Sequence, residues 1–260
     1  MNRMTSGNKV TFRLLRGEGG DNLKEVSYDV EAETGWVVLD AVLNIQAKQA
    51  PDLSVRWNCK AAKCGSCSAE VNGRPRLMCK TRLDDLDTTQ PVVVHPIKSF
   101  PHVKDLVTDV KWNYEVNKRI TPFTPAPNAD FTYFQEDVDR VQEFRKCIEC
   151  FLCQNVCHIL RNHEAHDRFV GPRFFVRMAG LEMHPMDTAD RTEQLAAADG
   201  VFMCNITKCC TVVCPEEIHI TDNAIIPLKE RVIDGRTRSS GCFESSPERS
   251  SGRSTAFAFA

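Results

Sequence analysis

The chain has few of the features that would place it in a membrane, outside the cell or on nucleic acid. It contains no run of 18 apolar residues, so we expect no segment that spans a membrane. Its first residues are polar and show no apolar signal segment, which gives no support for secretion or for disulfides. With a net charge of -2, it also lacks the basic excess of nucleic-acid binders, and we expect no nucleic-acid partner.

Motifs for independent substrate chemistry are missing as well. The sequence holds no G-x-G-x-x-G or P-loop for a nucleotide, and no G-x-S-x-G or H-E-x-x-H for hydrolysis. We assign no catalytic residue to this chain. We therefore expect that any chemistry on a substrate takes place in another subunit, with which this chain would associate.

Cysteine is the residue that the chain has in unusual number. Its 13 cysteines fall almost entirely into three groups rather than spreading along the 260 residues. Such grouping is typical of metal binding. Cys242 lies apart from the groups, in a Ser/Arg/Gly-rich end, and is expected to take no part.

The order of sequence patterns predicts an α+β chain in two domains. Residues 10–30 read as a hairpin, and a helix is expected over 36–50 with Thr34 as its cap. A second hairpin is centred on Asn72-Gly73, and VVVH at 92–95 suits a buried strand. We divide the chain into a first domain at 1–112, an extended Pro-containing linker at 113–134, a helical domain at 135–236 and a disordered tail at 237–260.

The first group of cysteines has the spacing of a plant-type ferredoxin. The pattern C-x4-C-x2-C is followed, after eleven intervening residues, by a fourth cysteine. It predicts a [2Fe-2S] cluster held by Cys59, Cys64, Cys67 and Cys79. Four thiolates can also hold a structural zinc ion, but zinc sites usually combine two C-x2-C pairs and this stretch has one. We favour iron-sulfur over a zinc-binding structural protein.

The second and third groups form an imperfect repeat of the bacterial ferredoxin run C-x2-C-x2-C-x3-C. In two-cluster ferredoxins the fourth cysteine of each run binds the other cluster. That rule assigns one complete [4Fe-4S] centre to Cys147, Cys150, Cys153 and Cys214. It leaves the other centre with Cys157, Cys204 and Cys210.

Threonine stands where the second run would carry its second ligand. Because Thr207 is a poor ligand for iron, we predict that this centre is a [3Fe-4S] cluster. Cys209 adjoins Cys210 and is an alternative fourth ligand, which would make the centre [4Fe-4S]. The register of the run favours Cys209 as a thiol that binds no iron.

These segments together resemble the iron-sulfur subunit of succinate dehydrogenase and quinol:fumarate reductase. The resemblance covers nearly the whole chain apart from the tail. It rests on RWNCKAAKCGSC with Cys79, FPHVKDLVTD, CIECFLCQNVC, DRFVGPRFF and CNITKCCTVVCP. Other iron-sulfur subunits, such as those of glycolate oxidation or heterodisulfide reduction, share the paired runs but typically lack the first domain.

The resemblance implies a β-grasp ferredoxin domain, a helical ferredoxin domain and two kinds of partner. A flavoprotein subunit would supply electrons from FAD, and a membrane anchor would receive them at quinone or at a centre of its own. The chain would then be peripheral, on the cytoplasmic face of the cell membrane. Succinate oxidation is the expected direction, with fumarate reduction as the alternative.

The sequence departs from the family around the expected exit for electrons. The stretch after Cys157 lacks the usual proline and tryptophan, and an asparagine follows Cys204 where a histidine is frequent. The residues at the equivalent positions, expected to lie near quinone, are His158, Asn162, Asn205 and Thr207.

Overall fold

The computed structural model of the chain describes residues 7–19 and 22–239. The predicted tail lies largely outside these ranges, and Cys242 with it. Its first residues, 237–239, belong instead to the last helix, α9 (Ile226–Ser239).

The first domain is built on a five-stranded mixed sheet with strand order β2-β1-β5-β3-β4. Strand β1 pairs antiparallel with β2 and parallel with β5, an arrangement that matches the expected β-grasp domain. A small second sheet holds the last two strands. The strands are β1 (Asn8–Arg16), β2 (Lys24–Ala32), β3 (Ser68–Val71), β4 (Arg74–Leu77), β5 (Val92–His95), β6 (His102–Lys104) and β7 (Val107–Thr108).

Alternation of apolar residues along β1 explains how the sheet forms its core. Val10, Phe12 and Leu14 occupy every second position and are all buried. They share one hydrophobic cluster with residues of helix α1 (Val38–Lys48). The predicted helix is confirmed, but it begins later than expected, after Val37, whose N–H donates to Asp40 Oδ2 at 3.1 Å.

The second predicted hairpin is also confirmed. Strands β3 and β4 pair antiparallel across Asn72-Gly73, and both turn residues have positive φ angles, 49° and 74°. This is the conformation that an Asn-Gly turn supplies most easily. It places Cys67 just before β3 and Cys79 just after β4, so the hairpin brings the ends of the first cysteine group back together.

The second domain is helical, and residues 109–239 contain no strand. Its elements are α3 (Gln135–Gln142), α4 (Leu152–Val156), α5 (His158–Arg161), α6 (Pro172–Glu182), α7 (Thr192–Ala197), α8 (Cys209–Val212) and α9, with short 3-10 turns at Glu143–Lys146 and Val201–Met203. The sheet domain has one such turn, at Leu83–Asp85. A wide turn at Ile220–Ile225 precedes α9. Pro227 follows this turn, and a proline ring disfavours a regular α-helix before it.

Two predictions about this half of the chain need correction. The expected extended linker at 113–134 begins inside a helix, α2 (Lys111–Asn117), because Trp112 and Val116 lie one turn apart and both contact the helical core. The sequence pattern also predicts helix across 136–156, but no helix forms at 147–151, where Glu149 and Phe151 have positive φ angles.

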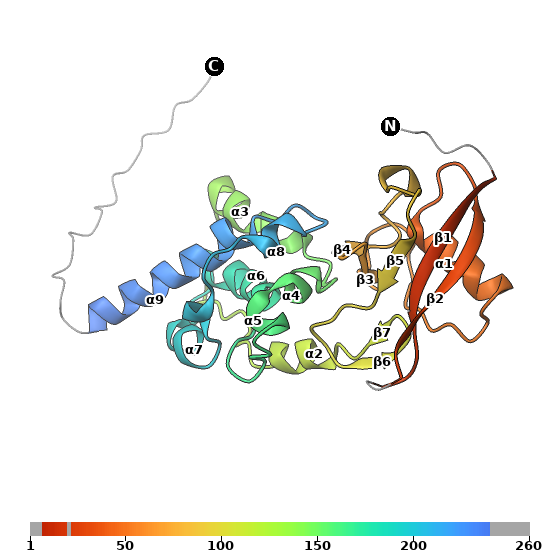
Figure 1. Cartoon of the computed structure of the whole chain (residues 1–260). Helices are drawn as coiled ribbons and strands as arrows, with labels where there is room; N and C mark the ends of the chain where they lie inside the picture. Colours follow the sequence, from red (N-terminus) through yellow and green to blue (C-terminus); the bar gives the residue numbers. More distant parts are fainter. Residues whose placement is uncertain (1–6, 20–21, 240–260) are drawn as a thin grey trace, which may run out of the picture.

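The two domains pack directly against each other (Figure 1). Strand β4 lies against α4, and the segment Cys150–Leu152 belongs to the hydrophobic core of the first domain. The sheet domain therefore completes its core with residues of the helical domain.

Candidate metal centres

The first cysteine group lies on a loop whose backbone N–H groups point at sulfur. Cys59 Sγ accepts from the N–H groups of Ala61 and Lys63 at 3.3 and 3.4 Å, and Cys79 Sγ accepts from Ala62 at 3.3 Å. Left-handed φ angles at Lys60 and Ala62 turn the backbone in this way. Such N–H groups stabilise thiolates and tune the potential of a bound cluster.

Burial and hydrogen bonding act in opposite directions on the thiols of this loop. Burial raises the pKa of Cys67 to about 12. Burial also opposes ionisation of Cys64, but hydrogen bonds from Ser66 and Cys59 lower its pKa to about 6. Because metal ligation requires thiolates, a positively charged metal centre is what would keep the buried members of this group ionised.

The four predicted ligands of the [4Fe-4S] centre, called the second set from here on, surround a cavity in the helical domain. Cys147, Cys150, Cys153 and Cys214 all line it, and the rest of the lining is largely apolar. Burial, with smaller contributions from the nearby Cys147 and Cys214, raises the pKa of Cys150 to about 12. The structure thus gathers the four thiols that the crossing rule assigns to one cluster, in a site whose chemistry fits iron and sulfide.

The three predicted ligands of the [3Fe-4S] centre, Cys157, Cys204 and Cys210, form the third set and lie near one another. Burial, with smaller contributions from the nearby Cys210 and Cys204, raises the pKa of Cys157 to about 11. Cys210 Sγ is also 3.4 Å from Thr221 Oγ1. These three cysteines are the set that the sequence leaves for the second ferredoxin cluster.

The two ferredoxin runs share one backbone conformation. Glu149 and Phe151 in the first run, and Ile206 and Lys208 in the second, all have φ angles between 54° and 62°. A short helix follows in each case, α4 or α8. Thr207 therefore occupies the same place in its loop as Cys150 does in the first.

Cys209 holds the position equivalent to Leu152, which is not a ligand position. Leu152 is 1% exposed and packs into the core of the first domain. The thiol of Cys209 contacts Thr207 instead, with Sγ 3.3 Å from Oγ1. That Cys209 binds no iron stays a prediction.

The cysteines of the described residues are free thiols, and no three ligating side chains there stand close enough to hold a single metal ion. A cluster of several irons spans a wider space than one ion, and the second set surrounds such a space. We conclude that the residues present fit iron-sulfur clusters.

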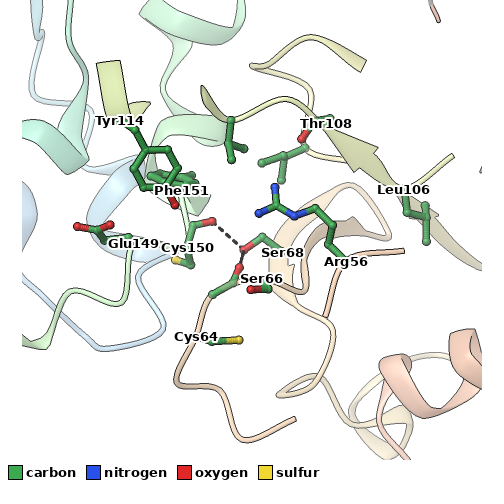
Figure 2. Close-up of a pocket in the computed structure, with 13 residues that line it drawn as sticks. Arg56, Cys64, Ser66, Ser68, Leu106, Thr108, Tyr114, Glu149, Cys150 and Phe151 are labelled. Carbon is green, nitrogen blue, oxygen red and sulfur yellow. Dashed lines mark hydrogen bonds between the residues drawn. The ribbon is translucent and has the colours of Figure 1, made fainter. Parts of the chain in front are cut away.

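The first group and the second set are in backbone contact. A Cβ added to Gly65 would lie 2.6 Å from Cys150 Cα, so only glycine permits this approach. Ser68 Oγ lies 2.9 Å from the carbonyl oxygen of Gly65 and 2.8 Å from that of Cys150, and its hydroxyl links the two loops (Figure 2).

The four residues expected near quinone flank the third set. His158 is half-buried, and Asn162, Asn205 and Thr207 are exposed. His158 and Asn162 bracket α5, directly after Cys157, whereas Asn205 and Thr207 follow Cys204. Each pair thus adjoins a cysteine of the same set, on the outer surface of the domain.

Sequence reasoning missed a buried arginine beside the second set. In the sequence, Arg168, Arg173 and Arg177 form a loose basic series, which predicts a solvated or partner-facing surface. The Arg173 side chain is instead only 2% exposed and pairs with Glu149. Arg168 and Arg177 are exposed, as expected. The available signal was that this basic residue adjoins phenylalanines that are themselves buried. Because burying an unpaired charge is costly, an arginine in such a segment is buried only when it has an oppositely charged partner.

The folds and the thiol sets define an iron-sulfur protein with two ferredoxin-type domains. Two family models match the chain: "2Fe-2S iron-sulfur cluster binding domain" over residues 11–115 and "4Fe-4S dicluster domain" over residues 143–218. The first match covers the sheet domain, and the second covers the two ferredoxin runs.

Comparison with individual proteins gives the family. A chain of the Mycobacterium smegmatis Sdh1 complex in the apo form is 54% identical, with a TM-score of 0.86 over 89% of this chain and 98% of that one. The fumarate reductase iron-sulfur subunit of Mycobacterium tuberculosis is 30% identical over 200 residues, 74% of this chain and 79% of that protein. The chain belongs to the family of succinate dehydrogenase and fumarate reductase iron-sulfur subunits.

A third relative is much longer. One subunit of the fumarate reductase (CoM/CoB) of Methanothermobacter marburgensis is 27% identical over 226 residues, which are 85% of this chain but 44% of that protein.

Within the described residues, no helix has both the length and the apolar character needed to cross a membrane.

Proposed function

We propose that the chain is the electron-transfer subunit of a succinate dehydrogenase. When bound, [2Fe-2S], [4Fe-4S] and [3Fe-4S] clusters would supply one-electron chemistry in series, from the FAD of a flavoprotein subunit to quinone or another acceptor at a membrane anchor. The succinate chemistry belongs to the flavoprotein subunit. The identity of 54% to a chain of an Sdh1 complex, against 30% to a fumarate reductase subunit, favours succinate oxidation as the direction.

The observation that carries this proposal is the continuity of the three thiol sets. Gly65 and Cys150 are in backbone contact, which joins the first set to the second. Burial raises the pKa of Cys153, and neighbouring cysteines, Cys210 among them, raise it further, so the second set adjoins the third. Electron transfer through a protein requires short distances between successive clusters, and adjoining ligand sets would provide them. It requires no substrate pocket between the clusters.

Each set would hold its cluster through the cysteines that the spacing assigns. Cys59, Cys64, Cys67 and Cys79 would bind [2Fe-2S], and Cys147, Cys150, Cys153 and Cys214 would bind [4Fe-4S]. Cys157, Cys204 and Cys210 would bind [3Fe-4S], because Thr207 supplies no thiolate. The backbone N–H groups at Ala61, Ala62 and Lys63 would hydrogen-bond the ligands of the first cluster.

An apolar surface beside the third set supports docking to a membrane anchor. Phe202, Met203 and Ile206, close to Cys204 in sequence, are 41%, 37% and 40% exposed. Large exposed apolar side chains this close in sequence favour an interface with another protein. His158, Asn162, Asn205 and Thr207 would lie at this interface, near the quinone or another acceptor in the anchor.

Low-temperature EPR of the anaerobically purified complex tests the proposal. We expect a [3Fe-4S] signal in the oxidised sample, a [2Fe-2S] signal after addition of succinate and a [4Fe-4S] signal after dithionite. A colourless sample with bound zinc would overturn the electron-transfer function. Clusters that are reduced by dithionite but never by succinate would favour the fumarate reductase alternative.

A further inference from the structure

Arg173 places a buried positive charge at the wall of the second thiol site. It stands at the start of α6, and its side chain is 2% exposed. The guanidinium donates to Glu149 through Nη2 and to Asn117 Oδ1 through Nη1 at 2.8 Å. Its Cζ atom lies 5.9 Å from the centre of the Phe151 ring. These contacts fix the charge in one place.

The same side chain lines the cavity that Cys147, Cys150, Cys153 and Cys214 surround. Its partner Glu149 stands between two of those cysteines in sequence and keeps 34% of its side chain exposed. Water therefore screens the carboxylate more than it screens the guanidinium. The ion pair leaves a net positive influence on the cavity.

One other charge faces this cavity. Glu216 lines it, and the carboxylate is 3.4 Å from Nζ of Lys63, which is 70% exposed. Arg173 is thus the cationic residue of the lining, because the remaining side chains there are apolar or are the cysteines themselves.

We propose that Arg173 is an electrostatic tuning residue that raises the reduction potential of the [4Fe-4S] centre, with Glu149 limiting the rise. The inference rests on the proposed function, because it requires that these four cysteines hold that cluster. Each electron accepted there adds one negative charge to a site that four thiolates already make negative. A fixed cation in a poorly screened site stabilises the reduced form more than the oxidised form.

The test is a redox titration of the intact complex, followed by EPR at each potential, for three glutamine variants. Arg173→Gln should lower the midpoint potential of the [4Fe-4S] signal, and Glu149→Gln should raise it. Arg177→Gln is the matched control, since it removes the same charge one turn along α6 from an exposed position, and it should leave the potential unchanged. In the Arg173 and Glu149 variants, the [2Fe-2S] midpoint should move less than that of [4Fe-4S].

Opposite shifts in the first two variants, with iron content equal to wild type, would support tuning. An unchanged midpoint in Arg173→Gln with the cluster intact would overturn it. If Arg173→Gln fails to retain the cluster, Glu149→Gln decides, because a midpoint that stays at the wild-type value there would also overturn the inference. Absence of any [4Fe-4S] signal from the wild-type complex would contradict the proposed function instead.

Discussion

Glu70 and Arg161 join the two domains through a two-point ion pair. The guanidinium donates from Nη1 to Oε1 at 2.5 Å and from Nη2 to Oε2 at 3.3 Å, and the Glu70 side chain is 1% exposed. Asn155 Nδ2 donates to the same carboxylate at 2.9 Å, and Lys98 Nζ lies 3.3 Å from it. Glu70 lies on β3, close after Cys67, and Arg161 ends α5, close after Cys157. The pair therefore holds two thiol-bearing segments in a fixed relation.

Removal of the arginine should destabilise the chain strongly. Arg161→Met would leave the buried Glu70 carboxylate with one amide and a half-exposed lysine, and breaking a buried pair costs about 3–5 kcal/mol. We expect loss of cluster absorbance at lower denaturant concentration than in wild type. Arg13→Met, which removes an exposed pair with Glu25, should cost only about 0–1 kcal/mol. Equal effects of the two variants would contradict the role given to the buried pair.

Alanine at Gly65 should separate the first two thiol loops. The added Cβ would lie 2.6 Å from Cys150 Cα at a φ angle of +68°, and overpacking of this kind costs about 1–3 kcal/mol before backbone strain is counted. In the assembled complex we expect slower reduction of the [4Fe-4S] centre in stopped-flow experiments. Gly73→Ala is the control, because its φ of +74° brings similar strain but nothing lies within 4 Å of the new Cβ.

Cysteine at position 207 should complete the third centre. Thr207 has the loop position that Cys150 holds in the first run, so Thr207→Cys would supply a thiolate for a fourth iron. EPR should then lose the oxidised [3Fe-4S] signal, and iron analysis should find one more iron per chain. Cys209→Ser should change neither quantity. A loss of iron in Cys209→Ser would show that Cys209 is a ligand.

The stability of the chain should depend on the protonation of Asp199. The residue is fully buried, and neither carboxylate oxygen has a hydrogen-bond partner in the described residues. Burial raises its pKa from 3.8 to about 6. The folded state thus holds a proton that the unfolded state releases, and the stabilisation present below pH 4 is lost as the pH rises to about 6.

Asp199→Asn removes this titration. Between pH 5 and pH 7, the stability advantage of the variant over wild type in thermal unfolding should grow. Its size should be on the order of the 1–3 kcal/mol that an unsatisfied buried acceptor costs. Asp190→Asn gives the opposite expectation. Hydrogen bonds from Thr192 hold the pKa of Asp190 below its usual value, so the carboxylate is stabilising at both pH values and its removal should destabilise. A pH-independent effect of Asp199→Asn would contradict the assignment.

Much of the fold was predictable because its signals are local. The Asn72-Gly73 turn, the apolar alternation of β1 and the helix after Val37 each depend on neighbouring residues. The grouping of cysteines was equally readable, since a ferredoxin loop fixes its spacing within a few residues.

Features that join distant segments were not predictable in the same way. Nothing near Glu70 in the sequence indicates that Arg161 lies opposite it. Arg173 reads as a surface charge until Glu149 and Asn117 are placed around it. The start of α2 was missed for a related reason, because Trp112 and Val116 form a helix face only where the second core is present to receive them.

The entry of Cys150–Leu152 into the core of the sheet domain has a consequence for synthesis of the protein. During synthesis, all four cysteines of the first group leave the ribosome well before Leu152 does. The hydrophobic core beside them is incomplete until the segment Cys150–Leu152 has also been synthesised. The core of the nascent sheet domain therefore stays incomplete until the first part of the helical domain has been synthesised. A fragment that ends at residue 112 would keep the first four thiols but would expose the apolar side chains that Phe151 and Leu152 cover in the full chain.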